Sequence, residues 1–162
     1  PIEVYGYKEF AIRADEAGVD GILVVDMPPE EAADLKQELD KYKIDLIFLV
    51  APTTTDERLE QISKIASGYI YYVSLKGVTG AANLDIDSVN YHLERMRNYI
   101  QLPVGVGFGI KDADTAKQVG ENADAVIVGS ALVSIVEELA SDKDKMVTKV
   151  GNLAKEISSA IT

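Results

Sequence analysis

The sequence contains no cysteine and a single histidine, His92. The absence of cysteine excludes disulfides, thiolate metal sites and a cysteine nucleophile. His92 has no second histidine to share a metal ion with, and it falls on a predicted helix away from any strand end. We therefore interpret His92 as a surface or hydrogen-bonded histidine, and we expect no metal site.

Long apolar runs and clusters of positive charge are also missing. No window is apolar over the ~18 residues that a membrane span needs. With 27 acidic and 16 basic residues, the net charge is −11 and the pI is near 4.5, which disfavours a nucleic-acid partner. The first residues do not resemble a secretory signal. We expect a cytoplasmic protein, and because the chain starts on Pro1 we expect it to be part of a longer one.

What the sequence does contain is a repeated alternation of strand and helix signals in a single domain, residues 1–162. The strand candidates are short, apolar and β-branched, a pattern typical of buried parallel strands; they are 21–26, 45–50, 69–73, 103–107 and 125–128. The segments between them have helical spacing of apolar residues. Capping residues precede three of these helices, at Thr55 or Asp56, at Asp87 and at Asp112, and Gly18 follows an earlier one.

Two architectures use such βα units, the open doubly wound sheet and the eightfold barrel. A complete barrel needs eight units and about 250 residues. The chain supplies five strand candidates, with a helix ahead of the first. Its α/β class is therefore predicted, whereas periodicity alone leaves both architectures open.

Glycines gather where the last three predicted strands end. They are Gly77 and Gly80 after the third strand, Gly107 and Gly109 at the fourth, and Gly129, followed by Ser130, at the fifth. Bare backbone N–H groups at strand ends, together with a helix N-terminus, favour a phosphate site. The competing interpretation of each glycine is ordinary turn structure. A dinucleotide fingerprint fails, because Ile110 and Asp112 stand where it requires glycine.

Four segments together resemble the tryptophan synthase α subunit family: 18–28 (GVDGILVVDMP), 71–81 (YYVSLKGVTGA), 106–110 (VGFGI) and 128–130 (VGS). The resemblance implies a (β/α)8 TIM barrel, of which this chain covers about the last five strands and their helices. It implies retro-aldol cleavage of indole-3-glycerol phosphate to indole and glyceraldehyde 3-phosphate, without metal or cofactor. It also implies an α2β2 assembly with a β subunit that carries pyridoxal phosphate.

The resemblance also assigns roles to individual residues. It places Gly80, Gly107, Gly109, Gly129 and Ser130 at the substrate phosphate. The catalytic Glu and Asp of the family have no counterpart in these residues and are expected upstream of Pro1. We therefore expect the chain to be inactive as it stands.

Supporting roles follow from the same resemblance. Tyr71 would lie beside the catalytic carboxylate, although it could equally be a barrel-filling aromatic, and Thr79 would belong to a mobile lid. Leu23, Leu49 and Phe108 would line the indole pocket, although apolar strand residues more often belong to a core.

Asp26 and Pro28 would communicate with the β subunit, although Asp26 could instead cap a helix. Two competing functions remain open at this stage. One is another phosphate-binding barrel enzyme of aromatic biosynthesis, and the other is a non-catalytic half-barrel that binds a phosphorylated metabolite.

Overall fold

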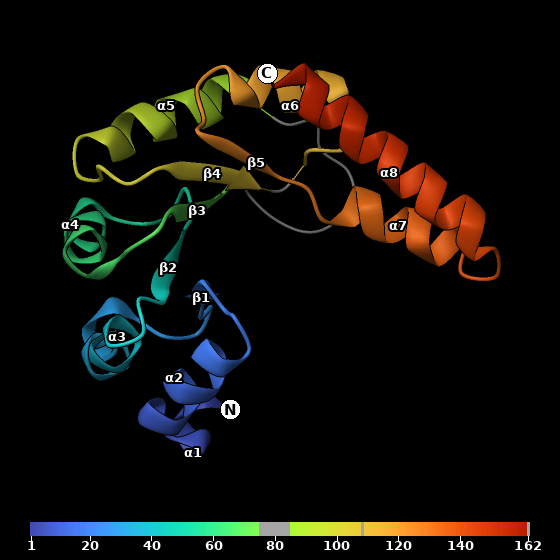
Figure 1. The fold of residues 1–162 in the computed structure, drawn as a ribbon. Helices are drawn as coiled ribbons and strands as arrows, with labels where there is room; N and C mark the ends of the chain where they lie inside the picture. The colour runs from blue at the N-terminus through green and yellow to red at the C-terminus, as the bar shows by residue number, and fades with distance from the viewer. Residues whose placement is uncertain (75–84, 108, 162) are drawn as a thin grey trace.

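The strands lie side by side in the order in which they occur in the sequence. The computed structural model describes residues 1–74, 85–107 and 109–161, and these form one five-stranded parallel sheet. Its strands are β1 (Gly21–Leu23), β2 (Asp45–Val50), β3 (Ile70–Val73), β4 (Val104–Gly107) and β5 (Ala125–Ile127). The N-terminus lies at the β1 end of the molecule and the C-terminus at the β5 end (Figure 1). The βα alternation predicted from the sequence is confirmed.

Helices connect successive strands along the outside of the sheet. They are α1 (Ile2–Tyr5), α2 (Tyr7–Glu16), the 3-10 helix η1 (Pro29–Glu31), α3 (Ala33–Asp40), α4 (Asp56–Ile65), α5 (Ile86–Arg97), α6 (Ala113–Gly120), α7 (Ser130–Glu138) and α8 (Lys143–Ala160). Within the described part of the chain, no helix is both long and apolar enough to cross a bilayer.

The core lies between the sheet and its helices. The sheet contributes side chains that are nearly inaccessible to solvent, at Leu46, Phe48, Val50, Ile70, Tyr72, Val104 and Val106. The helices meet them with their apolar stripes, including Leu35 and Leu39 of α3, Leu59 and Ile62 of α4, and Val89, Leu93 and Met96 of α5. Burial alternates along β3, where Ile70 and Tyr72 are buried while Tyr71 and Val73 are half-buried. The sheet is thus covered more fully on one face than on the other.

The structure confirms two of the three predicted helix N-caps and corrects the third. Thr55 caps α4 by accepting a hydrogen bond from the Arg58 N–H, and Asp112 forms a capping box with Thr115 at the start of α6. The prediction of Asp87 as a cap is wrong. Asp85 is the N-cap of α5 and accepts from the Ser88 N–H at 3.1 Å, because the helix already begins at Ile86.

The first strand is also shorter than predicted. Pairing of β1 with β2 ends at the Leu23–Ile47 pair, and the chain then turns, leaving Val25 73% exposed. β1 has only this one neighbour among the described residues, so its last predicted residues have no second ladder to hold them in the sheet. Gly18 takes φ +74 just after α2, as expected for a glycine that ends a helix.

Candidate phosphate-binding site

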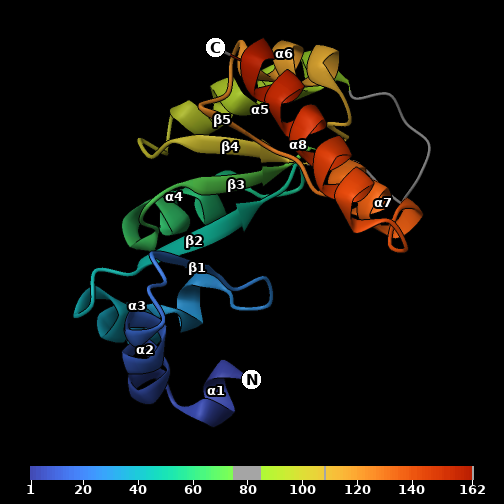
Figure 2. The ribbon, with the colours of Figure 1, turned by 45° about the vertical axis from the view of Figure 1, so that its right-hand side comes forward.

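The carboxyl ends of β3, β4 and β5 meet at one edge of the sheet. All three strands are parallel, and the pairs Val73–Gly107 and Gly107–Ile127 bring their last residues level. Figure 2 shows the arrowheads of β3 and β4 ending together near the start of α7. Ser74, just after β3, donates hydrogen bonds from its hydroxyl (2.9 Å) and its N–H (3.1 Å) to the carbonyl oxygen of Gly107. The ends of β3 and β4 are therefore directly connected.

β4 presents two glycines to the less covered face of the sheet, and neighbouring side chains fill the space that they leave. A Cβ on Gly107 would lie 2.3 Å from the Tyr71 hydroxyl oxygen. A Cβ on Gly105 would lie 3.0 Å from Ile127 Cδ1 and 3.5 Å from Tyr69 Cδ2. A side chain at position 107 would therefore force the Tyr71 ring to move. That position has a structural explanation in addition to any role in binding.

The other two glycines at this edge differ from Gly107 and from each other. Gly109 has φ +79, a backbone conformation that favours glycine whatever the surrounding space. Gly129 has φ −117, and no atom of the described residues lies within 4 Å of the position that its Cβ would take. Neither backbone conformation nor packing among the described residues explains a glycine at 129. An open approach to the backbone is what a bound group would need.

Gly129 is also the N-cap residue of α7. The N–H groups of Leu132 and Val133 donate to its carbonyl at 3.0 and 3.1 Å, so the amides of Ser130 and Ala131 precede the first hydrogen bond of the helix. Such amides, with the positive end of the helix dipole behind them, bind anions. Gly129 and Ser130 are both exposed, which leaves this end accessible.

An apolar wall adjoins the glycines on the same face. Leu49 pairs with Tyr71, and Leu23 pairs with Ile47, which lies on the same side of β2 as Leu49. Tyr71 and Leu49 are half-buried. Burial, with a smaller contribution from Tyr69, raises the pKa of the Tyr71 hydroxyl, so it is a neutral hydrogen-bonding group at physiological pH.

Several predicted site residues fall outside this cluster. Thr79, Gly80 and Phe108, as well as Gly77, lie outside the described residues. Asp26 is exposed in the turn after β1, and Pro28 occupies the N-cap of η1 without a side-chain hydrogen bond. Asp26 therefore does not cap η1, so that alternative is not realised.

The single histidine, His92, and the buried Tyr72 lie on the helix-covered side of the sheet. Tyr72 packs against His92 of α5, with ring centroids 6.0 Å apart, and burial raises the pKa of Tyr72 to about 12. Among the described residues, no group of three or more histidine or acidic side chains could hold a metal ion. His92 also contacts the ring of Tyr91, with centroids 5.2 Å apart.

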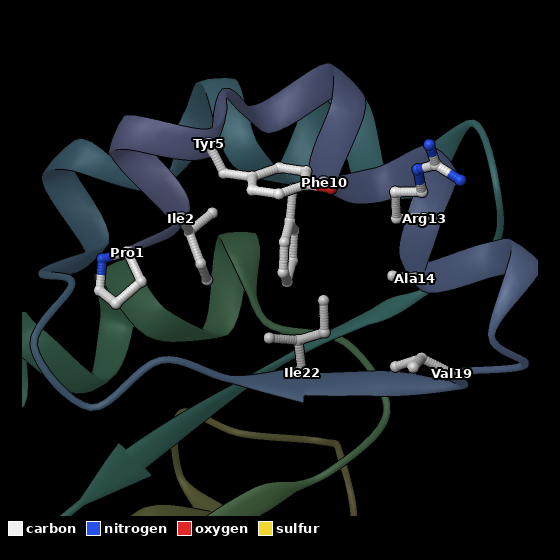
Figure 3. A pocket seen from close by; sticks show the side chains of 8 residues that line it. All are labelled: Pro1, Ile2, Tyr5, Phe10, Arg13, Ala14, Val19 and Ile22. Atoms are coloured by element: carbon white, nitrogen blue, oxygen red, sulfur yellow. The ribbon is translucent and has the colours of Figure 1, made fainter.

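A separate pocket of about 370 Å³ lies between α1, α2 and β1. Most of its lining side chains are apolar, and Phe10 points across it toward Ile22 (Figure 3). Arg13, which also lines it, is already paired with Glu9 (3.3 Å) and Glu16 (3.0 Å). The pocket lies at the far end of the sheet from β5 (Figure 1).

Comparison with known proteins decides the family. A family profile described as "Tryptophan synthase alpha chain" matches residues 1–162. The chain belongs to the tryptophan synthase alpha chain family. It is 65% identical over 161 residues to the tryptophan synthase alpha chain of Vesicomyosocius okutanii and 63% identical to that of Ruthia magnifica. In both comparisons 99% of this chain matches 61% of the relative, so the chain spans about three fifths of their length.

Solved structures of this family share the fold. The tryptophan synthase alpha subunit of Legionella pneumophila is 39% identical, with a TM-score of 0.86 over 99% of this chain and 59% of that one. A chain from the tryptophan synthase α2β2 complex of Pyrococcus furiosus is 35% identical, with a TM-score of 0.85 over 98% and 63%. The five-stranded sheet therefore corresponds to part of the TIM barrel of these proteins, and the open doubly wound alternative is excluded.

The sequence prediction missed one residue at this edge. Ser74 joins the ends of β3 and β4 through two donors, yet a serine after a strand has no distinctive sequence signal. Gly107 was visible in the sequence as a glycine at a strand end. That its carbonyl accepts hydrogen bonds from Ser74 was not visible.

Proposed function

We propose that this chain supplies the phosphate-binding part of a tryptophan synthase α subunit, a carbon–carbon lyase that cleaves indole-3-glycerol phosphate in tryptophan biosynthesis. The observation that carries the proposal is Gly129. It is bare, sterically unconstrained and placed at the N-terminus of α7, next to the joined ends of β3 and β4. Family membership over residues 1–162 supports the same substrate.

The phosphate would be held by backbone groups. Amides at Gly109, Gly129 and Ser130 would donate to its oxygens, with the Ser130 hydroxyl as a further donor, and Gly80 would complete the set. A phosphate monoester is a dianion near neutral pH, and several N–H donors in a partly dry site stabilise it without a buried cation. Gly107 would shape the pocket through its contact with Tyr71.

Cleavage needs two proton transfers at the other end of the substrate. A proton must reach the indole carbon that leaves, and a base must take the proton of the glycerol hydroxyl whose carbon becomes the aldehyde. The Glu and Asp that perform this work in the family have no counterpart in the present residues. Leu23, Leu49 and Phe108 would hold the indole ring, Tyr71 would support the carboxylate, and Thr79 would close the lid. The chain alone should therefore bind phosphate without releasing indole.

The partner is proposed on the same basis. The Pyrococcus furiosus relative is a chain of an α2β2 complex, and we assign the segment from the exposed Asp26 to Pro28 to contact with a β subunit. No cofactor is assigned to this chain, since pyridoxal phosphate would belong to the β subunit. We place the reaction in the cytoplasm.

Titration of the chain with glycerol 3-phosphate, followed by calorimetry or amide chemical shifts, tests the site. Gly129→Asp should weaken binding at least about tenfold, because a carboxylate would stand where the dianion sits. Gly151→Asp on α8 is the matched control, since its Cβ position also has no neighbour within 4 Å in the described part of the chain. Equal affinities of the wild type and Gly129→Asp would overturn the proposed site.

A second assay separates an enzyme subunit from a binding module. Joined to the remaining two fifths of a family relative, the chain should release indole from indole-3-glycerol phosphate. Phosphate binding that persists with no indole release from such a joined protein would favour the non-catalytic half-barrel instead.

A further inference from the structure

Ser74 makes an unusual double contact at the edge of the proposed site. Its hydroxyl and its N–H both donate to the carbonyl oxygen of Gly107, at 2.9 and 3.1 Å. The N–H bond is the last rung of the β3–β4 ladder, and the hydroxyl adds a second donor to the same oxygen. A carbonyl oxygen has two lone pairs, so the two donors together can occupy both.

The peptide at the end of β4 is thereby held from two sides. Ser74 fixes its carbonyl, while the Tyr71 hydroxyl lies over the Gly107 α-carbon, 2.3 Å from the position a Cβ would take. A planar peptide with a fixed carbonyl cannot rotate without losing both hydrogen bonds. Two residues further on, Gly109 turns the chain with φ +79. How Gly107 is held therefore sets the place from which the chain leaves β4 toward Gly109.

We propose that Ser74 is a positioning residue for the phosphate dianion. It would not touch the ligand. Its hydroxyl would keep the end of β4 in the orientation from which the Gly109 amide can donate to a phosphate oxygen. The proposal rests on the proposed function, because it assumes that this edge holds a phosphate monoester.

The competing explanation is that the hydroxyl only strengthens the sheet, and Ser67 provides the comparison. Ser67 also connects two segments through its hydroxyl and its backbone: its oxygen accepts from the Leu46 N–H at 3.0 Å, and its N–H donates to the Leu46 carbonyl at 3.0 Å. It precedes β3, whereas Ser74 follows it, so it lies at the opposite edge of the sheet. Removing either hydroxyl breaks the hydrogen bond described above, but only Ser74 is next to the candidate site.

The test compares Ser74→Ala, Ser74→Thr and Ser67→Ala in the 162-residue chain. Urea unfolding measures stability, and titration with glycerol 3-phosphate measures affinity. Both alanine variants should unfold at lower urea, whereas Ser74→Ala alone should raise the Kd, by about three- to tenfold for one lost hydrogen bond. Ser74→Thr keeps the hydroxyl and should restore the affinity.

The outcomes separate this proposal from the proposed function. A Kd of Ser74→Ala equal to that of Ser67→Ala, with the wild type binding normally, would overturn the positioning role alone. A wild type that does not bind glycerol 3-phosphate would overturn the phosphate site and this proposal with it. If Ser74→Ala does not fold, Ser74→Cys keeps the side-chain volume with a weaker donor and should still bind less tightly than Ser74→Thr.

Discussion

The two faces of the sheet differ in what they bury and in what they offer. On β3, Ile70 and Tyr72 point to the helices and are 0% and 1% exposed, whereas Tyr71 and Val73 on the other face are half-buried. The helix-covered face is filled with branched and aromatic side chains. The other face carries two glycines on β4, with side chains of β3 and β5 lying against them. One face thus carries most of the buried side chains, and the other is the less covered face that carries the candidate site.

The largest expected effect compares two leucines of β2. Leu46 points to the helices and is 1% exposed, whereas Leu49 lies on the open face and is half-buried. Leu46→Ala should lower the free energy of unfolding by about 2–5 kcal/mol, the usual cost of truncating a core leucine. Leu49→Ala should cost less than half of that while weakening binding of indole. Equal losses in urea unfolding would show that the two faces do not differ as described.

The next effect concerns crowding on the open face. Gly107→Ala places a methyl group against the Tyr71 hydroxyl and should destabilise the chain by about 1–3 kcal/mol. Tyr71→Ala should relieve the clash, so a double-mutant cycle should give a favourable coupling between the two changes. Additive losses in the cycle would mean that Gly107 is not held by Tyr71.

A smaller effect is expected at the helix layer. Asp112 accepts from the Thr115 N–H at 2.9 Å, and the hydrogen bonds from the Thr115 backbone and side chain lower the pKa of Asp112. Asp112→Ala should cost about 1 kcal/mol in thermal or urea unfolding, the usual value of an N-cap. Asp114→Ala in the same first turn is the control and should cost less. Phosphate affinity should respond weakly to both, since the change is confined to the helix layer.

The smallest effect is a pH dependence at the edge opposite the site. Burial by itself would raise the pKa of Asp124, but hydrogen bonds from the Val104 N–H (2.7 Å) and from Arg97 together lower it. A carboxyl with a lower pKa in the folded state stabilises the fold above its unfolded pKa of about 3.9 and loses this contribution as pH falls through its folded pKa.

Asp124→Asn should therefore reduce stability near neutral pH and flatten the acid limb of a Tm-against-pH curve between about pH 5 and pH 2. The loss should stay below about 1 kcal/mol, because the pair is partly exposed. An acid limb identical to that of the wild type would contradict the assignment.

Much of the fold follows from the sequence because local rules and tertiary packing agree. The apolar runs predicted every strand of the described sheet, and the twofold period of a strand puts Tyr71 on the same face as Val73. Unalternated strands indicate burial on both faces, yet the face that carries Tyr71 is only partly covered in the described residues. How fully a face of the sheet is covered depends on contacts with residues distant in the sequence, which no local pattern reveals.

The sequence showed where these glycines stand but not what surrounds each of them. Gly107, Gly109 and Gly129 all appear in the sequence as glycines at strand ends. In the structure Gly107 faces the Tyr71 hydroxyl, Gly109 has a positive φ, and the Gly129 Cβ position has no described neighbour within 4 Å. Capping was predicted at the right residue for Asp112 and two residues late for α5, since Asp85 and Asp87 are equally good caps in isolation. Hydrogen bonds such as those from Ser74 to the Gly107 carbonyl depend on how two strands align with each other, which the sequence alone does not reveal.

The sequential order of the strands has a consequence for biosynthesis. Each strand of the described sheet pairs with the strand made immediately before or after it. A nascent chain can therefore add each βα unit to an edge that already exists, without waiting for a distant segment to leave the ribosome. Because strands are added one after another, each folding intermediate has an edge strand with unpaired backbone groups. The next βα unit or a chaperone must protect that strand.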